Sequence, residues 1–65
     1  MRDMTQYAVH VWYEGKHDSI IVCGNDNSSK ALGMFRKIYG EELQYEIVHM
    51  ETGEMIATNI PQGEQ

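Results

Sequence analysis

The sequence predicts an α+β domain in which one amphipathic helix covers one face of an antiparallel sheet, in the order β-β-α-β-β. Four short segments read as strands because they alternate polar and apolar residues or are rich in β-branched types, and one segment has the apolar spacing of a helix. These segments are, in order, residues 5–14, 19–23, 29–39, 43–50 and 55–60. A chain of 65 residues has room for one core, so we expect a single domain over residues 1–65.

The first strand has two dissimilar faces, and its register against the core is left open. Tyr7, Val9, Val11 and Tyr13 share one face of the strand, whereas Ala8, His10 and Trp12 share the other. If the tyrosine face points inward, Trp12 lies on the second sheet face as an exposed interface anchor. In the alternative, Trp12 belongs to the core. Residues 14–18 form the turn to the second strand, with Gly15 able to adopt a positive φ.

The helix is expected to span about residues 29–39. Asn27, Ser28 or Ser29 can cap its start, and Gly40 supplies the cap at its end. Gly33 in the middle is either an exposed, tolerated glycine or a point of close approach to another backbone. The expected inward arc, about 160° wide at 100° per residue, contains Met34, Ile38, Ala31, Phe35, Tyr39 and Leu32.

The second hairpin turns at residues 51–54, with Gly53 in a left-handed conformation. A two-residue turn and a bulged three-residue turn both fit the sequence. Because the two choices shift the register by one residue, the inward face of this hairpin stays open. Pro61 ends the last strand, so we expect order over about residues 4–60 and a tail at residues 61–65.

Charge is distributed unevenly along the chain, whose formal net charge is −5. All five Lys and Arg residues precede position 41, whereas residues 41–65 contain six glutamates and no Lys or Arg. A nucleic-acid-binding surface needs a basic footprint, so direct binding to DNA or RNA is not expected. An acidic surface suits a basic protein partner, although acidity also serves solubility alone.

Catalytic and metal-binding patterns are missing from the sequence. Cys23 and the three widely spaced histidines match no paired ligand spacing, and no glycine-rich phosphate loop is present. We therefore expect a non-enzymatic protein without a cofactor or metal. A single cysteine, a polar N-terminal segment and no long apolar run predict a soluble cytoplasmic protein without a membrane span. A small domain without disulfides often oligomerises, so a homodimer is expected.

The helix end, Met34-Phe35-Arg36-Lys37-Ile38-Tyr39-Gly40, resembles that of the small dimeric phage inhibitors of uracil-DNA glycosylase. Those proteins share the F-x3-Y-G pattern, a similar size and an acidic composition. The resemblance implies that Phe35 and Tyr39 line an apolar pocket that captures a leucine of the glycosylase. This chain departs from the family at Arg36, where the family has an acidic residue, in a longer loop before the helix, and in a fuller second hairpin. Asp18-Ser19-Ile20 also looks like an edge-strand segment of the monomeric class of glycosylase inhibitor.

These observations together suggest a phage-type inhibitor that acts on a DNA-handling host enzyme, in the host cytoplasm, with uracil-DNA glycosylase as the named target. Leu32, Phe35 and Tyr39 would form the pocket. Asp18, Glu41, Glu42 and Glu46 would face the basic DNA-binding groove as phosphate mimics. Three alternatives remain open. The chain could inhibit another enzyme, such as a nucleic-acid-guided nuclease, or it could be an interaction module with no inhibitory role. The helix aromatics could also be plain core residues.

Overall fold

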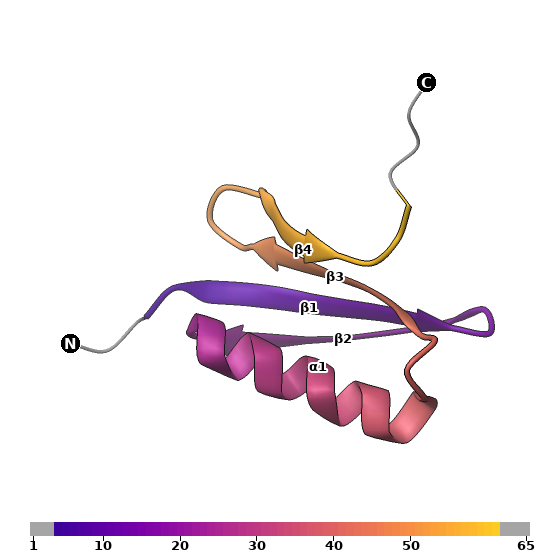
Figure 1. Ribbon diagram of the computed structural model, residues 1–65. Coiled ribbons are helices and arrows are strands. Elements are labelled where there is room, and N and C mark those ends of the chain that lie inside the picture. The colour runs from indigo at the N-terminus through magenta and orange to yellow at the C-terminus, as the bar shows by residue number, and fades with distance from the viewer. Residues whose placement is uncertain (1–3, 62–65) are drawn as a thin grey trace.

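The computed structural model describes residues 4–61 and has the element order that the sequence predicts. The chain forms four strands and one helix, and the helix lies against one face of the sheet (Figure 1). The elements are β1 (Gln6–Tyr13), β2 (Lys16–Cys23), α1 (Asn25–Tyr39), β3 (Gln44–His49) and β4 (Met55–Thr58). Of the tail expected at residues 61–65, residues 62–65 lie outside the described part of the chain. The α+β fold and the β-β-α-β-β order are therefore confirmed.

The four strands form one antiparallel sheet in the order β2-β1-β3-β4. The order places β1 and β3 at the centre and leaves β2 and β4 as the two edges. The helix α1 packs against β1 and β2, so it covers the β2 side of the sheet more than the β4 side. The opposite face of the sheet has no covering element among residues 4–61.

The tyrosine face of β1 points toward the helix. Val9 and Val11 are almost fully buried, and Tyr7 and Tyr13 pack around the core that they form with Leu43 and Ile47. The alternative in which Trp12 belongs to this core is wrong, because Trp12 pairs with His17 on the uncovered face of the sheet. On that same face an apolar row crosses all four strands at one level, and it consists of Ile21, Ala8, Val48 and Met55.

The first turn is tighter than the sequence suggested. Tyr13 pairs with Lys16, so only Glu14 and Gly15 form the turn, with φ values of 52° and 81°. Two positive φ values in succession have the twist that suits a two-residue hairpin. As a result β2 begins at Lys16 rather than at Ser19. The polar residues 16–18, which we expected in the turn, are part of the strand.

The helix begins four residues earlier than expected, and its expected side-chain caps are wrong. Gly24 is the N-cap residue, with a φ of 91° and no side-chain cap hydrogen bond. The Ser28 hydroxyl instead donates to the backbone carbonyl of Asn25, and Ser28 is fully buried within the first turn. The Asn27 side chain reaches back and donates to the carbonyl oxygen of Cys23 at 2.7 Å. A glycine at position 24 allows the sharp change of direction from β2 into α1.

The inward arc of the helix is narrower than its apolar pattern. Ala31, Leu32, Phe35 and Tyr39 pack against the core, whereas Met34 and Ile38 are 64% and 68% exposed. The sheet is too narrow on the β2 side to cover these two residues, because β2 is its edge. An apolar flank of the helix is therefore left open to solvent.

The second hairpin has a four-residue loop, so both turn lengths suggested by the sequence are wrong. The His49 N–H donates to the carbonyl oxygen of Glu54, and the Gly53 N–H donates to that of His49. Gly53 has the expected positive φ, 78°. A register shift between Ile47 and Val48 adds a bulge opposite β4, and this bulge places Ala57 against Ile47 at the core. The register could not be inferred from the sequence because the loop length and the bulge both change it.

We expect Gly33→Ala to stabilise the protein by about 1 kcal/mol, because alanine is the better helix former. A Cβ at Gly33 would meet no atom within 4 Å, which favours the tolerated, exposed glycine over a close approach within the chain. Urea denaturation followed by circular dichroism measures the change. The control is Gly53→Ala, which should destabilise the protein because Gly53 has a positive φ. A lower free energy of unfolding for Gly33→Ala would contradict this prediction.

Candidate protein-binding site

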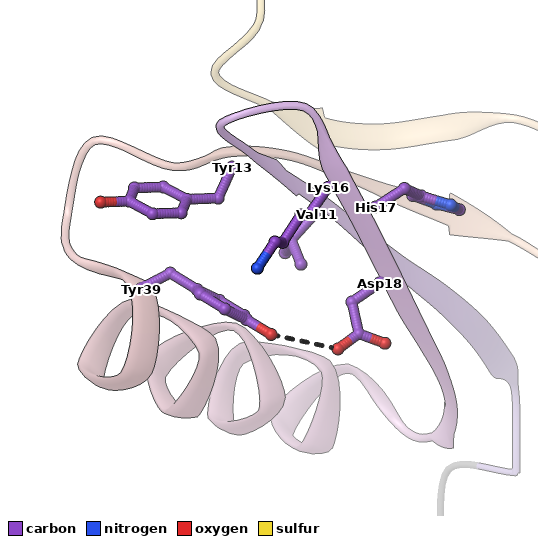
Figure 2. Close-up of a pocket in the computed structure, with 6 residues that line it drawn as sticks. All are labelled: Val11, Tyr13, Lys16, His17, Asp18 and Tyr39. Carbon is purple, nitrogen blue, oxygen red and sulfur yellow. Dashed lines mark hydrogen bonds between the residues drawn. The ribbon is translucent and has the colours of Figure 1, made fainter.

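An open cleft of about 420 Å³ lies where the first hairpin meets the end of the helix. Its lining residues are Val11, Tyr13, Lys16, His17, Asp18 and Tyr39 (Figure 2). The strands β1 and β2 supply all but one of these residues, and α1 supplies Tyr39. The His17 ring is directed away from Tyr39 and Asp18, as expected from the alternation of side chains along a strand. The cleft is shallow, so it suits a protruding group of another macromolecule better than an enclosed small molecule.

Tyr39 borders this cleft on the helix side (Figure 2). Its hydroxyl donates a hydrogen bond to the Asp18 carboxylate, with 3.4 Å between the two oxygens. Its ring lies near those of Tyr13 and Phe35, at centroid distances of 5.6 Å and 6.3 Å. Both distances fall within the usual range for aromatic pairs. The ring of Tyr39 is thus held by packing, while its hydroxyl remains at the surface beside an exposed carboxylate.

Carboxylates also border the other side of the two tyrosines. Glu41 and Glu42 are exposed in the loop after α1 and line a second hollow with Tyr13, Tyr39 and Gly40. The loop takes this path because Gly40 ends the helix with a φ of 100°, and its N–H donates to the carbonyl oxygen of Arg36. The end of the molecule near the first hairpin therefore has a tyrosine centre with carboxylates on two sides. We call this surface the tyrosine end, and it consists of Tyr13, Tyr39, Asp18, Glu41 and Glu42.

The remaining site residues suggested by the sequence lie elsewhere. Leu32 and Phe35 are half-buried and pack against the sheet, and neither lines the cleft beside Tyr39. Glu46 pairs with His10 on the uncovered face, whereas Asp18 pairs with Val11 on the helix face. The four acidic candidates therefore do not share one face of the sheet. Three of them gather at the tyrosine end, and Glu46 is separate.

Tyr13 and Lys16 line the cleft but were not among the site residues suggested by the sequence. The signal that could have found them is the two-residue turn, which pairs Tyr13 with Lys16 at the closed end of the hairpin. A five-residue turn was assumed instead, and it would have placed Lys16 in a loop. The Lys16 side chain extends toward Tyr39 in Figure 2, so the cleft contains a cation beside its carboxylate.

A second aromatic group occupies the uncovered face of the sheet. The rings of Trp12 and His17 have centroids 5.0 Å apart, and His10 Nδ1 lies 3.1 Å from His17 Nε2. The two histidine ring centroids are 5.3 Å apart, so the bonded nitrogens lie almost on the line between the rings. One imidazole must donate and the other must accept in this bond. Trp12 is half-buried in this group, so the uncovered face has an aromatic cluster of Trp12, His10 and His17.

Among residues 4–61, no group of three or more His, Cys, Asp or Glu side chains is arranged to hold a metal ion. The helix α1, the one helix in that part of the chain, is too short and too polar to cross a membrane.

The chain was compared with protein-family models, curated proteins and solved structures, and none of them gave a significant match.

Proposed function

We propose that this chain is a non-catalytic inhibitor that binds the nucleic-acid groove of a DNA-handling enzyme, with a bacterial uracil-DNA glycosylase as the target to test first. One observation carries the proposal. The hydrogen bond between Tyr39 and Asp18 joins two segments that resemble the two classes of glycosylase inhibitor. These segments are separated by 21 positions, yet in the fold they border one cleft.

The chemistry of the tyrosine end supports such a partner. Tyrosine rings provide a large apolar contact area together with a hydroxyl, and they are enriched at the centres of protein interfaces. The carboxylates of Asp18, Glu41 and Glu42 border these rings: Asp18 lines one hollow beside Tyr39, and Glu41 and Glu42 line another. A DNA-binding groove presents Lys and Arg side chains to phosphates, so a surface with this charge would be attracted to it.

The proposed mode of binding does not use a single row of carboxylates that mimics a row of phosphates. Glu46 lies on the uncovered face, so it does not join the carboxylates at the tyrosine end. We propose that the tyrosine end enters the groove and that Tyr39 meets an apolar group of the enzyme. Phe35 then acts by packing against the Tyr39 ring, and Leu32 acts by packing against the core, rather than by touching the partner.

Cleavage of a uracil-containing oligonucleotide by a bacterial glycosylase tests this function. We expect activity to stop as the chain reaches an equimolar ratio to the enzyme. Because charge attraction is screened by salt, inhibition should weaken as the salt concentration rises. Full activity in a several-fold molar excess of the chain would overturn the glycosylase target. Other groove-binding enzymes, such as nucleic-acid-guided nucleases, would then be tested in the same way.

Substitutions at the tyrosine end show whether this surface is the one that binds and inhibits the enzyme. Tyr39→Phe and Asp18→Asn remove the hydroxyl and the charge but keep the side-chain shapes, so the fold should survive. The double variant Glu41→Gln with Glu42→Gln should weaken inhibition by about tenfold, since each rim charge contributes on the order of 1 kcal/mol or less. The matched control is Glu51→Gln with Glu54→Gln, which removes the same charge from the distant loop between β3 and β4. Equal effects of the two double variants would mean that net charge alone matters.

A further inference from the structure

The backbone of β2 has an open edge, and the first turn determines which of its groups are exposed. Tyr13 and Lys16 close the two-residue hairpin, so alternate residues of β2 bond to β1, beginning with Lys16. The residues between them direct their N–H and C=O groups away from the sheet. These outward residues are His17, Ser19, Ile21 and Cys23.

Two of the outward backbone groups are already bonded within the chain. The Ser19 N–H donates to the Asp18 carboxylate at 3.0 Å, and the Cys23 carbonyl accepts from the Asn27 side chain at 2.7 Å. Within residues 4–61, the N–H and C=O of Ile21, the N–H of Cys23 and the C=O of Ser19 have no such bond. The edge therefore has a specific pattern of free and bonded groups.

We propose that β2 pairs with β2 of a second copy of this chain, antiparallel, about a two-fold axis at Ile21. In this register Ile21 lies opposite Ile21 of the second copy, and Ser19 lies opposite Cys23 of the second copy. Each chain donates from Ile21 to Ile21 and from Cys23 to Ser19, so the four free groups of Ser19, Ile21 and Cys23 become paired. His17 would lie opposite residue 25, which belongs to α1, so His17 is outside the paired segment. The one remaining pair in the register is the Ser19 N–H with the Cys23 carbonyl, and both of these groups are already bonded within their own chains.

Neighbouring registers lack this match. With the axis at Ile20, the Ile21 carbonyl would face the bonded Ser19 N–H. With the axis at Val22, the Ile21 N–H would face the bonded Cys23 carbonyl. Both shifts leave a free group opposite a bonded one, which costs about 1–3 kcal/mol for each unpaired group that is buried. The pattern of bonded groups therefore selects the axis at Ile21.

The exposed apolar side chains on both faces of β2 support pairing of this edge with a second copy of the chain. Ile20 and Ile21 are 44% and 57% exposed, and on opposite faces they would meet Val22 and Ile21 of the second copy. On the helix, the Arg36 guanidinium lies 5.3 Å from the Tyr45 ring centroid of β3. Met34 and Ile38, on the opposite flank of the helix, are therefore directed toward the β2 edge.

The spacing expected between the two helices of the dimer is that of two helices in direct contact. The helix α1 packs against β1 and β2, and strands lie about 4.8 Å apart, so pairing of β2 with β2 would set the two helix axes about 10 Å apart. Helices pack at about 8–10 Å. The exposed flank with Met34 would then be covered by the second helix. The other sheet edge is less suited to pairing, because β4 is only four residues long and lies beside a bulge.

Sedimentation equilibrium and chemical cross-linking test the dimer and its register. The wild-type chain should have twice the mass of one chain, and Ile21→Lys should be monomeric because a lysine on the edge opposes pairing. The matched control is Ile56→Lys on β4, which removes a similarly exposed isoleucine and should remain dimeric. Circular dichroism checks that both variants are folded. A monomeric wild type at its highest soluble concentration, or an Ile21→Lys dimer, would overturn the proposal.

The register has its own test, for which the chain supplies one thiol. Ser19→Cys should form disulfides with Cys23 of the second copy on mild oxidation, because residues directly opposite each other in a sheet lie within disulfide reach. The same substitution in a Cys23→Ser background should give no cross-linked dimer. A cross-link in that background, or none with Cys23 present, would overturn the axis at Ile21. Both readouts are independent of the glycosylase assay, so failure of the proposed target leaves this result unchanged.

Discussion

Leu43→Ala is expected to lower the free energy of unfolding by about 3 kcal/mol, which would leave a domain of this size largely unfolded at room temperature. Leu43 is 1% exposed and is among the largest fully buried side chains. It lies just before β3 and contacts the cluster of Val9, Val11 and Ile47 between sheet and helix. Removing its branched end leaves a cavity that a small core cannot fill by relaxation.

Urea denaturation followed by circular dichroism measures this loss, with Ile56→Ala as the control. The two substitutions delete the same number of carbon atoms, but Ile56 is 45% exposed on the edge strand β4. We expect the control to lose about 1 kcal/mol or less. Equal losses for the two variants would mean that Leu43 does not have the central role that its burial implies.

Asn59→Ala has the second-largest expected effect, a loss of about 2 kcal/mol. The Asn59 side chain accepts from the Tyr45 N–H and donates to the Leu43 carbonyl, both at 2.9 Å. It thereby continues the pairing of β3 beyond the end of β4, where no strand backbone is available. Alanine would leave the Tyr45 N–H and the Leu43 carbonyl without their partner, next to the most buried leucine of the core.

Thermal and urea unfolding of Asn59→Ala should be compared with Asn27→Ala. Asn27 also bonds to the backbone, but through a single hydrogen bond to the Cys23 carbonyl, so we expect about half the loss. If Asn27→Ala proved more costly than Asn59→Ala, the proposed role of Asn59 as a substitute for strand pairing would be wrong. Hydrogen exchange at the Tyr45 amide gives a local measure, since that amide should lose protection in Asn59→Ala alone.

The tyrosine end was only partly predictable from the sequence. Tyr39 and Asp18 were each identified from short resemblances, and Glu41 and Glu42 from their charge. Tyr13 was not among the predicted site residues, because its place beside Tyr39 depends on how the helix end sits over the hairpin. The grouping of Glu46 with the other carboxylates failed for a related reason. Neighbours in sequence can lie on opposite faces of a sheet.

The sequence by itself determined the element order, the four inward helix residues Ala31, Leu32, Phe35 and Tyr39, and the glycines at turns and ends. These depend on local periodicity and on positive φ. Tertiary structure decided the rest. The turn of two residues at Glu14 and Gly15 lengthened β2, the bulge at Ile47 set the last register, and the edge position of β2 left Met34 and Ile38 exposed. Each of these depends on which strands become neighbours, and strand pairing joins residues far apart in the chain. Local propensity therefore determines the elements, while their pairing determines which side chains and backbone groups remain free to bind.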